Sequence, residues 1–92
     1  MKLLIDSIKE FCEHNDYEFR CDYSGRFMYG RTCVGIVTNC GQNYLAMLME
    51  LVAWLQCDDL EDDFNIYDLG EPMMDDMGLG KIIYFPNVKG MF

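Results

Sequence analysis

The N-terminal part of the chain carries the pattern of an amphipathic helix. Over residues 2–14, apolar side chains recur with the 3.6-residue period of one helix face. These side chains are Leu4, Ile5, Ile8, Phe11 and Cys12. Asn15 and Asp16 follow, and both residue types favour turns. The pattern predicts a helix over residues 2–14 whose apolar face packs on a core.

Two strands are predicted next, because the period of alternation falls from 3.6 residues to two. In residues 17–23, aromatic residues and a cysteine alternate with charged residues, as in a strand with one wet face. Residues 31–38 also alternate, and the connection between the two segments contains Gly25 and Gly30. Two neighbouring strands with a short glycine-bearing link indicate an antiparallel hairpin.

A second helix is predicted over residues 43–57, with Asn39 or Asn43 as its N-cap. Only Glu50 and Gln56 are clearly polar within it. A helix that is apolar almost all round is buried on more than one side. We therefore expect this helix either to be central to the core or to place one face against a partner.

The last third of the chain is rich in loop-forming residues, and it predicts shorter elements. Residues 58–64 indicate a short helix and residues 65–69 a strand, whereas residues 81–85 predict a strand that Pro86 ends. The order α-β-β-α-(β)-β is typical of an α+β fold. We expect a three- to four-stranded antiparallel sheet with two helices packed on one face. The length of 92 residues predicts a single domain over residues 1–92.

Composition excludes several classes of protein. A chain that is 51% hydrophobic and 25% charged is not wholly disordered. No apolar run approaches the ~18 residues that cross a bilayer, and no signal-peptide pattern opens the chain. The five cysteines form an odd set without a secretion signal, which favours reduced thiols in a cytoplasm. We expect no membrane partner and a cytoplasmic location.

The patterns of metal and nucleophile chemistry are missing from the sequence. His14 is the only histidine and no CxxC occurs, which disfavours a structural zinc site or a Cys–His catalytic pair. A calcium-binding EF-hand loop starting at Asp59 fails, because Phe64 and Gly70 occupy the positions that require Gly and Glu. We expect no catalytic residue, no metal and no cofactor.

Charge is distributed unevenly along the chain. Sixteen acids against seven bases give a formal net charge of −9, and residues 32–80 contain ten acids and no base. Nine of those acids lie within residues 58–76, the acidic segment. They are Asp58, Asp59, Glu61, Asp62, Asp63, Asp68, Glu71, Asp75 and Asp76. Such a segment either solubilises a small apolar domain or presents carboxylates to a basic partner.

The connection between the first two strands mixes arginine with aromatic residues. Residues 23–31 contain Arg26, Tyr29 and Arg31, and exposed Arg and Tyr are favoured anchors of protein interfaces. The alternative is a twisted hairpin whose aromatic side chains partly cover the core. Arg26 and Tyr29 therefore join the nine acids as candidate partner-binding residues.

In size, acidity and α+β layout, the chain resembles the small acidic proteins that phages encode against host defences, anti-CRISPR inhibitors among them. The segments Tyr23–Gly30 and Asp76–Pro86 are also similar to segments of uncharacterised phage proteins. No motif in these segments names an activity. The resemblance implies an inhibitor that acts in the host cytoplasm on a defence nuclease.

Taken together, the sequence favours a non-enzymatic acidic interaction protein that mimics nucleic acid. Duplex DNA carries about one charge per 1.7 Å of axis, and a compact acidic surface can occupy a basic groove built for phosphates. The partner is then a protein with a basic nucleic-acid-binding surface, and no nucleic acid is bound directly. Two alternatives stay open: a homo-oligomeric assembly subunit that pairs through the second helix, or a domain that binds a small anionic ligand through Arg26 and Arg31.

Overall fold

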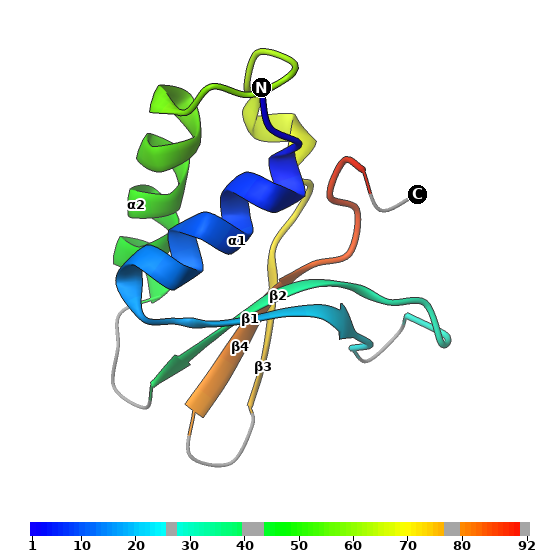
Figure 1. Cartoon of the computed structure of the whole chain (residues 1–92). Coiled ribbons are helices and arrows are strands. Elements are labelled where there is room, and N and C mark those ends of the chain that lie inside the picture. The colour runs from blue at the N-terminus through cyan, green and yellow to red at the C-terminus, as the bar shows by residue number, and fades with distance from the viewer. Residues whose placement is uncertain (26–27, 40–43, 77–79, 91–92) are drawn as a thin grey trace.

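A computed structural model describes residues 1–25, 28–39, 44–76 and 80–90 of the chain (Figure 1). Its helices are α1 (Leu4–Asn15), α2 (Tyr44–Cys57) and the 3₁₀ helix η1 (Ile66–Asp68). Its strands are β1 (Glu18–Tyr23), β2 (Cys33–Asn39), β3 (Met73–Asp76) and β4 (Gly80–Phe85). In the described part of the chain, no helix is long and apolar enough to cross a membrane.

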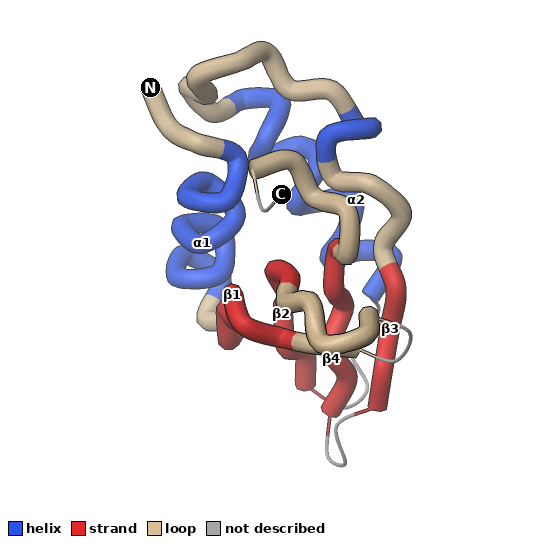
Figure 2. Tube along the Cα trace, turned by 90° about the vertical axis from the view of Figure 1, so that its right-hand side faces the viewer, coloured by secondary structure: helices blue, strands red, loops and turns tan. Residues whose placement is uncertain are grey.

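The four strands form one antiparallel sheet in the order β1-β2-β4-β3. Both α-helices lie on the same side of this sheet, as the two perpendicular views show (Figure 1, Figure 2). The predicted α+β class, the antiparallel sheet and the element order are therefore confirmed. Because β1 and β3 are the outer strands, each has one neighbour in the sheet.

The main core lies between the two helices and the sheet. Phe11 and Ile8 of α1 and Leu51 and Leu55 of α2 are at most 1% exposed. They meet side chains of β2 and β4 that point to the helices, namely Val34, Ile36, Ile83 and Phe85. The amphipathic pattern of the first helix thus predicted its buried face correctly, since Ile8, Phe11 and Cys12 are all buried.

A second, smaller core covers the opposite face of the sheet. Its buried members are Met28, Cys33, Ile82 and Tyr84, so β2 and β4 are apolar on both faces. Met28 comes from the connection between β1 and β2, and its side chain packs on this face. Gly25 in the same connection lies against Tyr84, where an added Cβ would be 2.5 Å from the ring atom Cζ.

The acidic segment differs from its predicted secondary structure. The strand predicted over residues 65–69 is wrong, because Ile66–Asp68 forms the helix η1. The Asn65 side chain accepts a hydrogen bond from the Tyr67 N–H (3.0 Å), and the Asp68 carboxylate accepts one from the Asn65 N–H (3.3 Å). This capping box favours a helical turn over an extended chain. The strand between α2 and the last strand is instead β3, which begins later in the chain, at Met73.

Residues 58–64 do not form the predicted short helix, because their backbone bonds to the N-terminus instead. The Lys2 N–H donates to the Asp59 carbonyl (3.0 Å), and the Glu61 N–H donates to the Lys2 carbonyl (2.7 Å). The same contacts hold Lys2 outside α1, which begins at Leu4. Asn43, one of the two predicted N-caps of α2, lies outside the described residues.

Candidate interaction surface

The first five acids of the acidic segment lie on a turn that follows α2 and sits beside the N-terminus (Figure 1). The two backbone hydrogen bonds to Lys2 fix this turn, which we call the acidic turn and define as residues 58–63. Its position therefore depends on the first residues of the chain, and the carboxylates on it are presented from an anchored backbone.

Asp58 is the one residue of the acidic turn whose carboxylate points inward. It accepts a hydrogen bond from the Ser7 hydroxyl and forms an ion pair with Lys2 Nζ at 3.0 Å. Ser7 is fully buried and its Oγ also accepts a hydrogen bond from Trp54 Nε1 at 3.2 Å. The hydrogen bond from Ser7 and the charge of Lys2 lower the pKa of Asp58 below its usual range. With 14% of its side chain exposed, Asp58 mainly joins α1, α2 and the N-terminus.

The other carboxylates of the acidic turn face solvent. Asp59 lies 3.7 Å from the N-terminal amine, and Asp62 lies 3.0 Å from Lys89 Nζ. Glu61 and Asp63 are exposed and make no ion pair with any residue that the structure describes. Exposed ion pairs are weak, so Asp59 and Asp62 remain accessible to a partner's cation.

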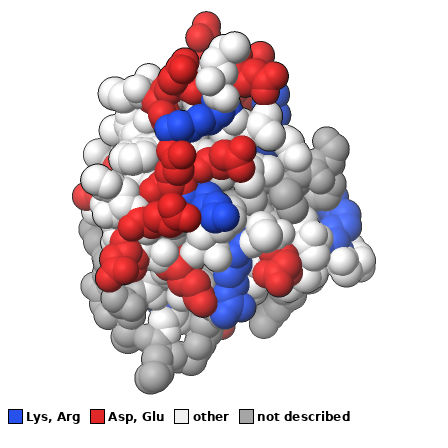
Figure 3. Space-filling view, viewed as in Figure 1, with Lys and Arg blue, Asp and Glu red and all other residues white. Residues whose placement is uncertain are grey.

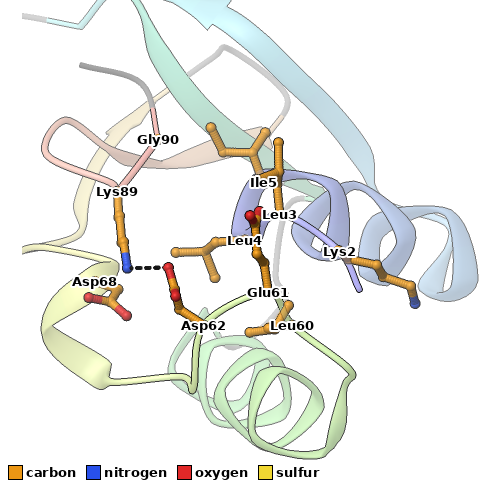
Figure 4. A pocket seen from close by; sticks show the side chains of 10 residues that line it. All are labelled: Lys2, Leu3, Leu4, Ile5, Leu60, Glu61, Asp62, Asp68, Lys89 and Gly90. Atoms are coloured by element: carbon orange, nitrogen blue, oxygen red, sulfur yellow. Dashed lines mark hydrogen bonds and ion pairs between the residues drawn. The ribbon is translucent and has the colours of Figure 1, made fainter.

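A shallow hollow of about 110 Å³ separates the acidic turn from the C-terminal segment (Figure 4). Its walls are mostly apolar, with Leu3, Leu4 and Leu60 on one side, while Lys89 and Asp62 form an ion pair on the other. The carboxylate of Asp62 raises the pKa of Lys89. Small-molecule sites commonly enclose about 300–1,000 Å³, so this hollow is too small for that role.

Carboxylates of α1 continue the acidic surface. Asp6, Glu10 and Glu13 are exposed, and Lys2 Nζ contacts Glu10 as well as Asp58, at 2.5 Å and 3.0 Å. In Figure 3, acidic side chains run from the turn at the top of the molecule down over α1, with a few basic side chains among them. We call this surface the acidic band. Its exposed members are Asp6, Glu10, Glu13, Asp59, Glu61, Asp62 and Asp63.

Of the remaining acids of the acidic segment, only Asp68 lies near the acidic turn. Asp68 caps η1 and lines the same hollow as Asp62 (Figure 4). Glu71 precedes β3, and Asp75 and Asp76 belong to β3 at the far edge of the sheet. The acidic turn and β3 lie at opposite ends of the molecule in both views (Figure 1, Figure 2). The nine predicted acids therefore form two groups rather than one face.

Asp75 is bound within the fold. Its carboxylate accepts a hydrogen bond of 2.6 Å from the Tyr23 hydroxyl, and the Tyr23 ring lies 4.9 Å from the ring of Tyr84. Burial and the hydrogen bond to Asp75 raise the pKa of Tyr23. Like Asp58, Asp75 holds the fold together more than it faces solvent, and nothing in the sequence distinguishes either residue from its exposed neighbours.

The arginine and aromatic residues of the hairpin connection are only partly described. Arg26, a predicted partner-binding residue, lies outside the described residues. Tyr29 is 91% exposed and has a positive φ of 54°, so it projects away from the core. Arg31 is also exposed. The anionic-ligand pocket predicted from Arg26 and Arg31 is therefore not described as a whole.

The four cysteines that the structure describes, and His14, do not form a cluster. Cys12 and Cys33 are buried, and burial raises the pKa of Cys12 to about 12, which keeps its thiol protonated at neutral pH. The His14 ring lies 5.4 Å from the Trp54 ring. Within the described ranges, no three side chains of the types that ligate metals come together.

No family model, no curated protein and no solved structure matches this chain.

Proposed function

We propose that this protein is a non-enzymatic interaction protein whose acidic band binds a basic protein surface that otherwise contacts nucleic acid. The observation that carries the proposal is that the acidic turn and α1, which are far apart in the sequence, lie side by side in the fold. Lys2 joins the inward Asp58 of the acidic turn to Glu10 of α1, and this places the exposed carboxylates of the two regions beside one another in a larger negative surface than either region alone.

The spacing of the α1 carboxylates supports mimicry of a phosphate backbone. Asp6, Glu10 and Glu13 are spread along about 10 Å of helix axis at a rise of 1.5 Å per residue. One strand of DNA carries a phosphate about every 3.4 Å of axis, and therefore about three over the same length. A groove that binds phosphates through Lys and Arg meets a similar line of charge on this helix.

Basic side chains reduce the charge of the acidic band without reversing it. Lys2 is engaged by Glu10 and Asp58, and Lys89 by Asp62, while Lys9 is exposed on α1. The acids outnumber these bases, and the chain as a whole carries −9. A field of one sign steers an oppositely charged partner and falls off within about 8 Å at physiological salt.

The biological setting follows from the resemblance to phage-encoded acidic proteins. In that setting the protein is an inhibitor in the host cytoplasm, its partner is a defence nuclease, and no nucleic acid or cofactor is bound directly. Tyr29 adds an exposed aromatic side chain outside the acidic band, where it is available as a second contact.

An assembly subunit is the second candidate function, and one feature of α2 favours it. Leu45 and Met49 are four residues apart on this helix, and they are 57% and 74% exposed. An exposed apolar stripe of this kind often marks an interface. Light scattering distinguishes the two functions: a monomer across the micromolar range rejects homo-oligomeric assembly.

Affinity capture tests the proposed function. The immobilised protein is exposed to bacterial lysate, and bound proteins are eluted by increasing salt. We expect nucleic-acid-binding proteins to elute over a moderate salt range, because the contacts are electrostatic. If no basic nucleic-acid-binding protein is retained, the proposal is wrong.

A further inference from the structure

The outer edge of β3 is an unpaired strand edge. β3 pairs with β4 on one side only, and among the described residues no strand or bridge pairs with its other side. An edge strand presents a row of backbone N–H and C=O groups that can bond to a further strand. The edge of β1 differs, because its pairing with β2 shifts register between Arg20 and Tyr23.

A hollow of about 130 Å³ lies beside this edge, between β3 and the first turns of α2. It is lined by apolar residues, which are Tyr44, Leu48, Pro72, Met73, Met74 and Ile83. Met73 and Met74 are 40% and 39% exposed, which is high for large apolar side chains in a sheet. At ~30 Å³ per water, the hollow holds about four heavy-atom groups, the size of one aliphatic side chain.

Acids flank the hollow and restrict which strand can pair there. Glu71 lies two residues before β3 and Asp76 ends it, and both are exposed. Asp76 lies on the same face of β3 as Met74, and the nearest cation in register is Lys81 of β4, which pairs with Asp76. Pairing with β3 of a second copy would bring the same acids close to one another, and residues 32–80 contain no base to offset them. Like charges across a strand pair are destabilising, whereas opposite charges are favourable.

We propose that β3 and the first turns of α2 bind an extended segment of a partner protein in which Lys or Arg residues stand on both sides of an aliphatic residue, one of them two positions away from it. The segment adds to the sheet as a fifth strand, beside β3. Its backbone bonds to the free edge, an aliphatic side chain fills the hollow, and its cations meet Glu71 and Asp76. This surface is separate from the acidic band, and the inference stands whether or not the acidic band binds a partner.

The same acids oppose pairing of this edge with copies of itself. Proteins often protect exposed edges with short strands, charges and proline, and β3 has all three, with Pro72 directly before it. These features oppose a neutral or acidic strand. The charges attract only a basic strand. The edge of β3 therefore favours pairing with basic strands over neutral or acidic ones.

A synthetic peptide of about seven residues, in which Lys residues stand two positions on either side of a central Val or Leu and both ends are blocked, tests the inference. The measurement is a titration of the ¹⁵N-labelled protein that follows the amide resonances and the dissociation constant. We expect the amides of residues 73–76 to shift and to gain protection from hydrogen exchange. The matched peptide with Glu in place of Lys should not bind.

Two double variants with equal loss of charge provide the control. Glu71→Gln with Asp76→Asn removes the exposed acids before and at the end of β3, and should raise the dissociation constant about tenfold. Asp6→Asn with Glu13→Gln removes two acids of the acidic band, and should change it less than about twofold. Both pairs are exposed, so folding is checked by comparing amide spectra.

Several results would overturn the inference. Shifts confined to α1 or the acidic turn would assign the peptide to the acidic band, and equal weakening by the two double variants would show attraction by net charge alone. Equal binding of the Glu peptide would remove the role of the acids. A dimer that protects the amides of residues 73–76 without peptide would make a second copy the occupant.

Discussion

The hydroxyl of Tyr23 on β1 donates a hydrogen bond of 2.6 Å to the carboxylate of Asp75 on β3, although these strands form opposite edges of the sheet. Three strand spacings of about 4.8 Å separate the edges of a flat sheet. The register shift after Arg20 turns the end of β1 over the sheet face opposite the helices, where the Tyr23 ring packs on Tyr84. One hydrogen bond thus closes the sheet over its second core.

Tyr23→Phe removes this hydrogen bond while it keeps the aromatic ring. The half-buried Asp75 carboxylate then loses its donor, and we expect the free energy of unfolding to fall by about 1–2 kcal/mol. Urea denaturation followed by circular dichroism measures the change. Tyr29→Phe is the control, because Tyr29 is exposed, and it should change stability by less than about 0.5 kcal/mol. Equal effects of the two substitutions would refute the role of the Tyr23 hydroxyl.

Ser7→Ala tests the contacts that hold the acidic turn. The Ser7 hydroxyl is buried, donates to Asp58 and accepts from Trp54, so its removal leaves two polar groups without this partner. We expect a loss of about 1–3 kcal/mol in the free energy of unfolding.

Ser24→Ala is the matched control for Ser7, because Ser24 is exposed and the same hydroxyl is lost. Its effect should stay within about 0.5 kcal/mol. Trp54 fluorescence reports the local change as well, since Trp54 Nε1 bonds to Ser7 Oγ. An unchanged stability and an unchanged Trp54 spectrum in the Ser7 variant would rule out the arrangement around Asp58.

The lowered pKa of Asp58 makes stability depend on pH in acid. Because the folded chain holds this proton less tightly, the unfolded chain binds more protons, and stability rises with pH there. The contribution is complete above the ordinary value of 3.8 and is lost as the pH falls through the lower pKa of the folded state. Denaturation curves between pH 2 and pH 6 should show a smaller acid loss in Asp58→Asn than in the wild type. An identical acid loss would contradict the assignment.

Periodicity predicted most of the fold, because α1, β1, β2 and α2 each carry a pattern in their own residues. The strand β3 was missed, since Met73–Asp76 shows no alternation of apolar and polar residues. Its strand conformation comes from pairing with β4, a tertiary contact that the local sequence pattern does not indicate. The strand predicted over residues 65–69 failed because the local capping box of Asn65 and Asp68 outweighs a weak apolar pattern.

The candidate surface was predicted in part. The exposed acids of residues 58–63 follow from charge clustering alone. The α1 acids were missed because residues 1–31 are nearly neutral in sum, although the spacing of Asp6, Glu10 and Glu13 places them on one helix face. The inward positions of Asp58 and Asp75 arise from partners 51 and 52 residues away, Ser7 and Tyr23, and the sequence holds no signal for such contacts.

Displacement of DNA tests the central claim most directly. A basic nucleic-acid-binding protein captured from lysate is bound to a labelled DNA duplex, and this protein is added while fluorescence anisotropy is recorded. The double variant Glu61→Gln with Asp63→Asn is compared with Asp22→Asn and Glu50→Gln, which removes two exposed acids outside the acidic band.

The account predicts that the wild type and the Asp22 and Glu50 variant displace the duplex at similar concentrations. The Glu61 and Asp63 variant should need about tenfold more protein. A duplex that stays bound at every concentration, or equal weakening in the two double variants, would contradict binding of a nucleic-acid site by the acidic band.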